Sequence, residues 1–119
     1  MKILICEDNK LAMRALSVFL GKEGFEITNA IDGNEAMELI DKNEYDLVLV
    51  DIHLPYHSGL ELIRHLRSEL NKKTPVIVVS AFSDQQIQRQ AYELGINDYL
   101  VKPIDPTSLI DKIKTLLRN

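Results

Sequence analysis

The sequence predicts a doubly wound α/β fold, in which five helices cover a five-stranded parallel sheet of strand order 2-1-3-4-5. Two observations lead to this fold class. Five short aliphatic runs alternate with segments of helical periodicity along the chain, and strands that are separated by helices pair in parallel. Three of the runs are continuously apolar, which is typical of strands that helices bury on both faces.

The character of each run assigns its strand to a place in the sheet. Those at 3–6, 47–50 and 76–79 are apolar throughout and are predicted to be central. The run at 25–28 alternates between apolar and polar residues, as a half-buried edge strand does. The run at 99–101 is short and has polar neighbours, which suits the opposite edge. Strand order 2-1-3-4-5 satisfies all five placements.

Five helices are predicted from apolar residues at helical spacing and from capping residues at helix starts. Ser58 and Glu61 form a Ser-x-x-Glu capping box before the third helix, and Asp105 precedes a first-turn proline in the last. The approximate predicted limits are 11–24, 32–40, 58–70, 83–95 and 105–117.

Composition limits the class of protein. The chain of 119 residues is 45% hydrophobic and 27% charged, with a net charge of −4. These values predict one globular domain, residues 1–119, and disfavour direct nucleic-acid binding, which usually needs a basic patch. The single cysteine, Cys6, is expected to be buried, with a pKa raised by acidic neighbours, and fits a reducing compartment. The sequence has no signal peptide and no apolar run of membrane-spanning length, so we expect a cytoplasmic location without membrane binding.

Polar side chains follow the predicted strands at the edge where such folds bind ligands. Glu7 and Asp8 follow strand one, and Asp51 follows strand three. Ser80 follows strand four and Lys102 follows strand five. The carboxyl ends of parallel strands share one edge, and the switch point of this strand order lies between strands one and three. We therefore expect these five side chains to gather in one crevice.

Three carboxylates in one crevice repel one another, so the sequence predicts a bound cation. Hard oxygen ligands suit Mg²⁺ or Mn²⁺, and Mg²⁺ typically keeps several waters while binding one or two carboxylates. A metal, the Lys102 ammonium and the Ser80 hydroxyl around one aspartate are the groups that phosphoryl transfer needs. Asp51 is then predicted to act as the nucleophile and to form an aspartyl phosphate.

Four segments carry a family resemblance over essentially the whole chain. They are "ILICEDN", "LVLVDIHLPYHSG", "PVIVVSA" and "GINDYLVKP". With them the chain resembles the response-regulator receiver domains of two-component signal transduction, which have a flavodoxin-like fold. The resemblance implies a phosphorylation-activated signalling switch rather than an enzyme that acts on a separate substrate. Such a domain catalyses only its own phosphotransfer and dephosphorylation.

The resemblance also implies roles at the acidic crevice. Glu7 and Asp8 look like the acidic pair that holds Mg²⁺, and Asp51 looks like the phosphoacceptor, which is itself a metal ligand. The backbone carbonyl of His53 is implied as a further metal ligand.

Other implied roles lie on strands four and five. Ser80 looks like the hydroxyl that hydrogen-bonds the phosphoryl group, and Lys102 looks like the lysine that contacts it. The bond between Lys102 and Pro103 is implied to be cis. Tyr99 looks like an aromatic rotamer switch that turns inward together with Ser80 on phosphorylation, although a plain core aromatic is the alternative.

The resemblance implies partners too. The phosphoryl donor would be a phosphohistidine on a sensor histidine kinase or a phosphotransfer protein. The surface formed by the fourth helix, fifth strand and fifth helix would control an effector domain or partner, which the sequence does not name. Phosphorylation-promoted dimerisation is a further possibility that the family offers.

This sequence departs from the family pattern in ways that concern the lifetime of the phosphoryl group. His53 stands where methionine is frequent, and Ile104 where phenylalanine is common. In the family, the positions of His53 and Phe82 flank the approach of water to the phosphoryl group. We expect two large side chains there to obstruct that approach, although a His53 nitrogen holding the attacking water is the alternative.

The sequence disfavours three other classes of protein and one other kind of site. An FMN carrier needs a hydroxyl- and glycine-rich loop after strand one, and a haloacid-dehalogenase-like phosphatase wants a second aspartate where His53 stands. A docking module without phosphorylation would not need the full set of reactive groups. We interpret His53 and His57, which flank Pro55, as solvent-exposed loop residues, and we expect neither these two nor His65 to be ligands of a transition metal.

Overall fold

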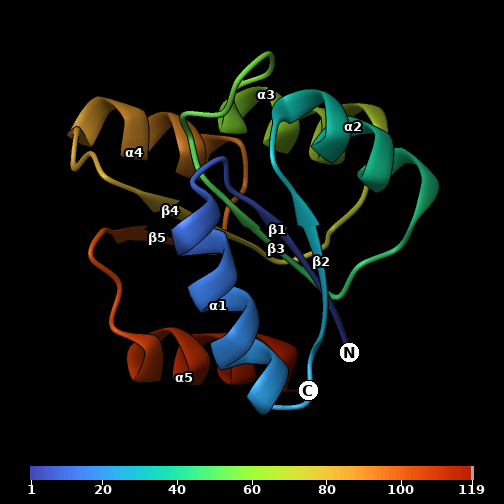
Figure 1. The fold of residues 1–119 in the computed structure, drawn as a ribbon. Helices are drawn as coiled ribbons and strands as arrows, with labels where there is room; N and C mark the ends of the chain where they lie inside the picture. The colour runs from blue at the N-terminus through green and yellow to red at the C-terminus, as the bar shows by residue number, and fades with distance from the viewer. Residues whose placement is uncertain (119) are drawn as a thin grey trace.

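The protein is described by a computed structural model over residues 1–118, which contains the predicted five-stranded sheet (Figure 1). All strand pairs are parallel, in the order β2-β1-β3-β4-β5, which confirms the predicted fold class. The strands are β1 (Lys2–Cys6), β2 (Glu26–Ala30), β3 (Leu47–Val50), β4 (Val76–Ser80) and β5 (Asp98–Val101).

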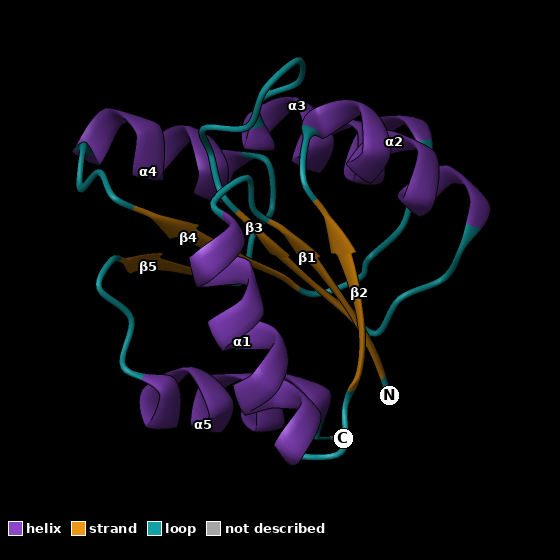
Figure 2. Cartoon of the chain, viewed as in Figure 1, coloured by secondary structure: helices purple, strands orange, loops and turns teal. Residues whose placement is uncertain are grey.

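Helices cover both faces of this sheet, with α1 and α5 on one face and α2, α3 and α4 on the other (Figure 2). Side chains of a strand alternate between the two faces of the sheet. Ile3 and Ile5 of β1 therefore lie in the core under α1 and α5, whereas Leu4 and Cys6 lie in the core under α2, α3 and α4. The helices are α1 (Lys10–Lys22), α2 (Gly33–Lys42), α3 (Gly59–Arg64) with a π-helical segment η1 (His65–Glu69), α4 (Gln85–Glu93) and α5 (Pro106–Leu117).

The burial of each strand agrees with its predicted place. All residues of β3 and β4 are buried, as are all residues of β1 after Lys2. The edge strands β2 and β5 are only partly buried. Among the residues described, no helix combines the length and apolar character that crossing a bilayer requires.

Helix starts follow the predicted capping residues closely. The Ser58 hydroxyl accepts from the Glu61 amide at 3.2 Å, and the Glu61 carboxylate accepts in return from the Ser58 amide. Asp105 caps α5 with Pro106 at its first position. Within the predicted stretch 83–86, Asp84 is the cap of α4 and accepts from two amides of the first turn.

Two elements differ from the sequence prediction. The edge strand β2 runs from Glu26 to Ala30, two residues beyond the predicted end, because it pairs with the whole length of β1 from Lys2 to Cys6. The third helix was predicted as one regular helix, but its second half is π-helical, with the Leu70 amide bonded to the carbonyl of His65 at 3.0 Å.

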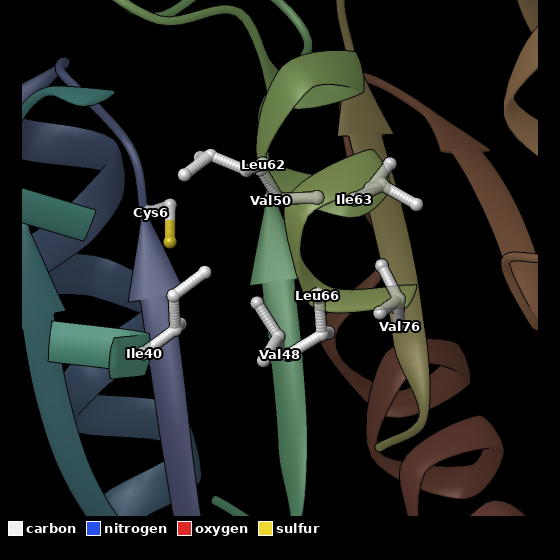
Figure 3. Close-up of a pocket in the computed structure, with 8 residues that line it drawn as sticks. All are labelled: Cys6, Ile40, Val48, Val50, Leu62, Ile63, Leu66 and Val76. Carbon is white, nitrogen blue, oxygen red and sulfur yellow. The ribbon is translucent and has the colours of Figure 1, made fainter. Parts of the chain in front are cut away.

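A small apolar cavity lies between the sheet and α3, with a volume of about 10 Å³ (Figure 3). Cys6 lines it together with side chains that are all aliphatic, so it offers a water no polar partner. Burial is the main cause that raises the pKa of the Cys6 thiol, and the charge of Glu35 adds to it. The thiol is therefore an inert core group, although the cause differs from the acidic neighbours that the sequence suggested.

Candidate functional site

Three carboxylates meet at the carboxyl edge of the sheet. Glu7 and Asp8 follow β1, Asp51 follows β3, and one oxygen from each lies within 4.8 Å of the others. Glu7 and Asp51 are buried, at 1% and 6% exposure, whereas Asp8 is exposed. This cluster has the hard oxygens and the solvent access that a partly hydrated Mg²⁺ requires.

Lys102 follows β5 and reaches two of these carboxylates. Its Nζ donates to Glu7 Oε1 at 2.5 Å and to Asp51 Oδ2 at 2.9 Å. Burial lowers the pKa of Lys102, but the hydrogen bonds to Glu7 and Asp51 outweigh burial and raise it. The ammonium therefore stays charged, and it offsets one of three negative charges, which leaves an excess that favours a divalent cation.

Backbone contacts hold the two buried carboxylates in place. Asp51 Oδ1 accepts from the His53 amide at 2.9 Å, and Glu7 Oε2 accepts from the Asn9 amide at 3.1 Å. The Gly59 amide donates to the Ile52 carbonyl at 2.8 Å and so ties the start of α3 to the segment after Asp51. Backbone amides next to the ends of β1 and β3 thus hold the two carboxylates in position.

Ser80 and Tyr99 are both joined to the loop that follows β4. Ser80 is fully buried, and its Oγ accepts from the Phe82 amide at 3.2 Å. Tyr99 is 8% exposed, and its hydroxyl donates to the Phe82 carbonyl at 2.9 Å. Tyr99 is therefore turned inward in this structure, and its hydroxyl is linked through Phe82 to Ser80.

The rings of His53 and Phe82 contact each other beside this loop. Their centroids are 4.6 Å apart with an interplanar angle of 67°, an edge-to-face arrangement. The sequence singled out both positions as flanks of the phosphoryl group but did not predict that the rings touch. The backbone of Phe82, which joins Ser80 to Tyr99, was missed altogether, because no residue type signals such a role.

A pocket of about 220 Å³ opens next to the site, between α1 and the segment after β5. The bond from Lys102 to Pro103, at its border, is cis, which is the isomer that the resemblance implies. Glu7 and Lys102 line the polar end of the pocket. Its apolar lining consists of Ala12, Ala15, Leu16, Phe19, Pro103, Ile104 and Pro106.

The three histidines lie outside the carboxylate cluster. His53 is exposed in a loop as predicted, and His57 pairs with Glu61 at 3.0 Å. His65 lies in η1, inside the predicted third helix, with a side chain only 17% exposed. Its ring nitrogens contact Asp41 at 2.6 Å and Glu69 at 3.0 Å. Within residues 1–118, the acidic cluster is the group with metal-ligand geometry.

The parallel sheet of this order carries an acidic cluster and a lysine at its carboxyl edge, which is the arrangement that the receiver-domain resemblance implies. A family model for the response regulator receiver domain matches residues 3–114. The chain belongs to this family, whose members are signalling domains of two-component systems.

Particular relatives agree with this assignment. The transcriptional regulatory protein SrrA of Staphylococcus aureus is 37% identical over 117 residues, which are 98% of this chain and 48% of SrrA. The chain thus spans about half the length of the curated relatives that it matches. The receiver domain of the Francisella response regulator 1452 is 33% identical, with a TM-score of 0.92 over 98% of this chain and 96% of that one.

A third relative bears on the metal. The receiver domain of the sensor histidine kinase PA1611 from Pseudomonas aeruginosa is 28% identical, with a TM-score of 0.89 over 99% of this chain and 98% of that one. That domain was solved with a magnesium ion coordinated in its active site cleft.

Proposed function

We propose that Asp51 accepts a phosphoryl group from a phosphohistidine of a sensor histidine kinase or phosphotransfer protein, in a step that depends on Mg²⁺ or Mn²⁺. The observation that carries this proposal is the contact geometry of Asp51. One carboxylate oxygen pairs with Lys102 and the other accepts from the His53 amide, at the edge of the sheet that also carries Glu7 and Asp8.

Glu7, Asp8, Asp51 and the backbone carbonyl of His53 would hold the metal. Their donor atoms are all oxygens, and the three carboxylates exceed the one ammonium in charge. Asp8 is exposed, which leaves room for the waters that Mg²⁺ keeps. The magnesium in the similar PA1611 receiver domain supports this assignment.

The chemistry of the transfer follows from these positions. An Asp51 oxygen forms a bond to phosphorus while the bond from phosphorus to the donor imidazole nitrogen breaks, and the electron pair returns to the imidazole. Bound metal supplies positive charge to the phosphoryl oxygens. The Lys102 ammonium adds a second positive charge, and the His53 amide keeps the Asp51 carboxylate oriented.

We further propose that residues 1–119 act as one switch domain, whose output face is α4, β5 and α5. Phosphorylation adds roughly −1.5 to −2 charges and new acceptor oxygens. The Ser80 hydroxyl would donate to these oxygens, and Tyr99 would be favoured in its inward position. This shift changes the surface to which an effector domain, a partner or a second receiver domain binds. Phosphorylation can shift the equilibrium between the two states only by the difference in the free energy with which the phosphoryl group interacts with each state.

Labelling with acetyl phosphate tests the proposal. We expect an acid-labile label on the wild-type chain with Mg²⁺, and none on Asp51→Asn or with excess EDTA. Asp46→Asn is a matched control, since Asp46 lies before the opposite end of β3 and its carboxylate accepts from the Lys2 amide. Undiminished labelling of Asp51→Asn would refute the proposal.

A further inference from the structure

We propose that Arg67 and Lys72 form a clamp that holds the C-terminal ends of α2 and α4 to each other, and that this clamp is the hinge of α4. Both residues belong to the end of the third helix, in η1 and in the turn that follows it. The inference goes beyond the proposed function, because the contacts of the clamp lie outside the carboxylate cluster and its test needs no phosphoryl group.

The Arg67 guanidinium holds the end of α4. Its Nε and Nη2 both donate to the Gly95 carbonyl, at 3.2 Å and 3.0 Å. Gly95 follows the last turn of α4 and has a φ of 100°, the left-handed conformation in which glycine commonly ends a helix. A Cβ at Gly95 would lie 3.3 Å from Arg67 Nε, so the guanidinium packs closely against this residue.

Lys72 connects the same guanidinium to the end of α2. Arg67 Nη1 donates to the Lys72 carbonyl at 3.0 Å. The Lys72 ammonium donates in turn to the carbonyls of Ile40 and Asn43, at 3.3 Å and 3.4 Å. A cation at the C-terminal end of a helix is stabilised by the carbonyls that the helix leaves free. One side chain thus fixes the end of α4, and the backbone that it contacts is fixed to the end of α2.

The π-helical segment places contacts on both of its sides. His65 contacts Asp41 of α2, whereas Arg67, two residues later, reaches the end of α4. Leu66 lies between them and is buried in the core. Asn71 has a φ of 52° and turns the chain after η1. Segments of π-helix are rare and often occur at functional positions, so its place between two helix ends supports a mechanical role.

The other anchors of α4 lie at the same end. Ala91 is the buried residue of this helix, and Ile96, just after it, is 7% exposed. Gln85 and Gln86 of the first turn are exposed. A segment with few buried contacts opens at a lower free energy than a packed one. The first turn of α4, which follows the loop after β4, should therefore open more readily than the last turn.

The clamp gives α2 an influence on the proposed output face. Because Lys72 fixes the carbonyl to which Arg67 donates, a change at the end of α2 that displaces Lys72 would loosen the end of α4. The reverse coupling must have the same size, since coupling free energies are reciprocal. The structure thus offers a route to α4 that does not begin at the phosphorylation site.

Hydrogen exchange of backbone amides, followed by NMR on the unphosphorylated chain, tests the clamp. The amides of Leu94 and Ile96 close the last turn of α4, and the Gln88 amide closes the first. We expect Gln88 to exchange faster than the other two in wild type. Arg67→Met removes the guanidinium and keeps an unbranched stem, and it should accelerate exchange at Leu94 and Ile96 by about tenfold or more. The rate at Gln88 should stay at its wild-type value.

A double-mutant cycle tests the connection to α2. Lys72→Met should accelerate exchange at Ile96, although the Lys72 ammonium contacts only residues at the end of α2. Arg67→Met should likewise accelerate exchange at the Asn43 amide, which bonds to the end of α2. In the double variant, Lys72→Met should add nothing at Ile96, because the guanidinium through which it acts is gone.

Two further variants control for a general loss of stability. Lys114→Met removes an ion pair with Glu23 on the other face of the sheet and should leave the rates in α2 and α4 unchanged. Arg67→Lys keeps the charge without the planar fork, and it should give a smaller change than Arg67→Met in the same direction. Wild-type exchange at Ile96 in Arg67→Met or in Lys72→Met, or factors that multiply in the double variant, would overturn the inference. Equal acceleration at Gln88 would do so too, because α4 would then open as one unit without a hinge.

Discussion

Gly59 is the residue of this site whose replacement by alanine has the most direct structural consequence. It is the first residue of α3 and lies against the segment that follows the phosphoacceptor. A Cβ at Gly59 would lie 2.5 Å from the Asp51 carbonyl oxygen and 2.9 Å from the Ile52 Cα. Ordinary contact begins near 3.4 Å, so the two backbones must separate by nearly an ångström.

The cost of Gly59→Ala can be worked out from these contacts. Overpacking of this kind costs about 1–3 kcal/mol. Separation also weakens the bond from the Gly59 amide to the Ile52 carbonyl, which contributes about 1 kcal/mol. The helix preference of alanine over glycine returns at most about 1 kcal/mol. We expect a net loss of about 1–3 kcal/mol in the free energy of unfolding.

Gly21 offers a control with the opposite sign. It is the next-to-last residue of α1, and a Cβ there meets nothing within 4 Å. Gly21→Ala should raise the free energy of unfolding by about 0.5–1 kcal/mol, since alanine is the better helix former.

Urea denaturation near neutral pH measures both variants. The midpoint should fall for Gly59→Ala and rise for Gly21→Ala at an unchanged slope. Wild-type stability of Gly59→Ala would refute the close approach of α3 to the Asp51 segment. A Gly21→Ala variant less stable than wild type would show that the space beside Gly21 is not open as described.

Two further predictions concern the metal and pH. Asp8→Ala should abolish the weak binding of Mg²⁺ measured by titration calorimetry, whereas Asp84→Ala, at the cap of α4, should retain it; equal affinity in both would place the metal elsewhere. The hydrogen bond from Asp41 is the main cause that raises the pKa of His65. The pairing of charged His65 with Asp41 therefore stabilises the fold fully below the ordinary histidine pKa of about 6.5, and this contribution is lost as pH rises through the raised pKa. His65→Gln should therefore lower the free energy of unfolding by about 0.2–1 kcal/mol at about pH 5.5 and by less at about pH 9. A cost that grows with pH would contradict the pairing.

The strand order of the sheet could be predicted because local apolar patterns distinguish central strands from edge strands. The continuous runs that became β1, β3 and β4 could only be central, and the alternating run near Glu26 could only be an edge. Once the order was set, the gathering of the polar residues that follow these strands was a consequence of topology.

Other features depend on side-chain reach and on register, which local patterns do not contain. The pairing of Lys102 with Glu7 requires the side chain of the residue after the edge strand β5 to reach a residue after β1, past β4 and β3. Neither the π-helical segment that begins at His65 nor the contact of His65 with Asp41 has a sequence signature here. The contact between His53 and Phe82 also has no sequence signature, because it depends on how two loops pack against each other.

The most direct test of the central claim identifies which residue carries the phosphoryl group. Treatment with acetyl phosphate and Mg²⁺, followed by borohydride reduction, converts a phosphorylated aspartate to homoserine, which peptide mass spectrometry locates. We predict homoserine at position 51 and at no other aspartate, and none when Mg²⁺ is omitted. Homoserine at Asp8 or Asp84 in place of Asp51, or equal conversion without the metal, would contradict the account.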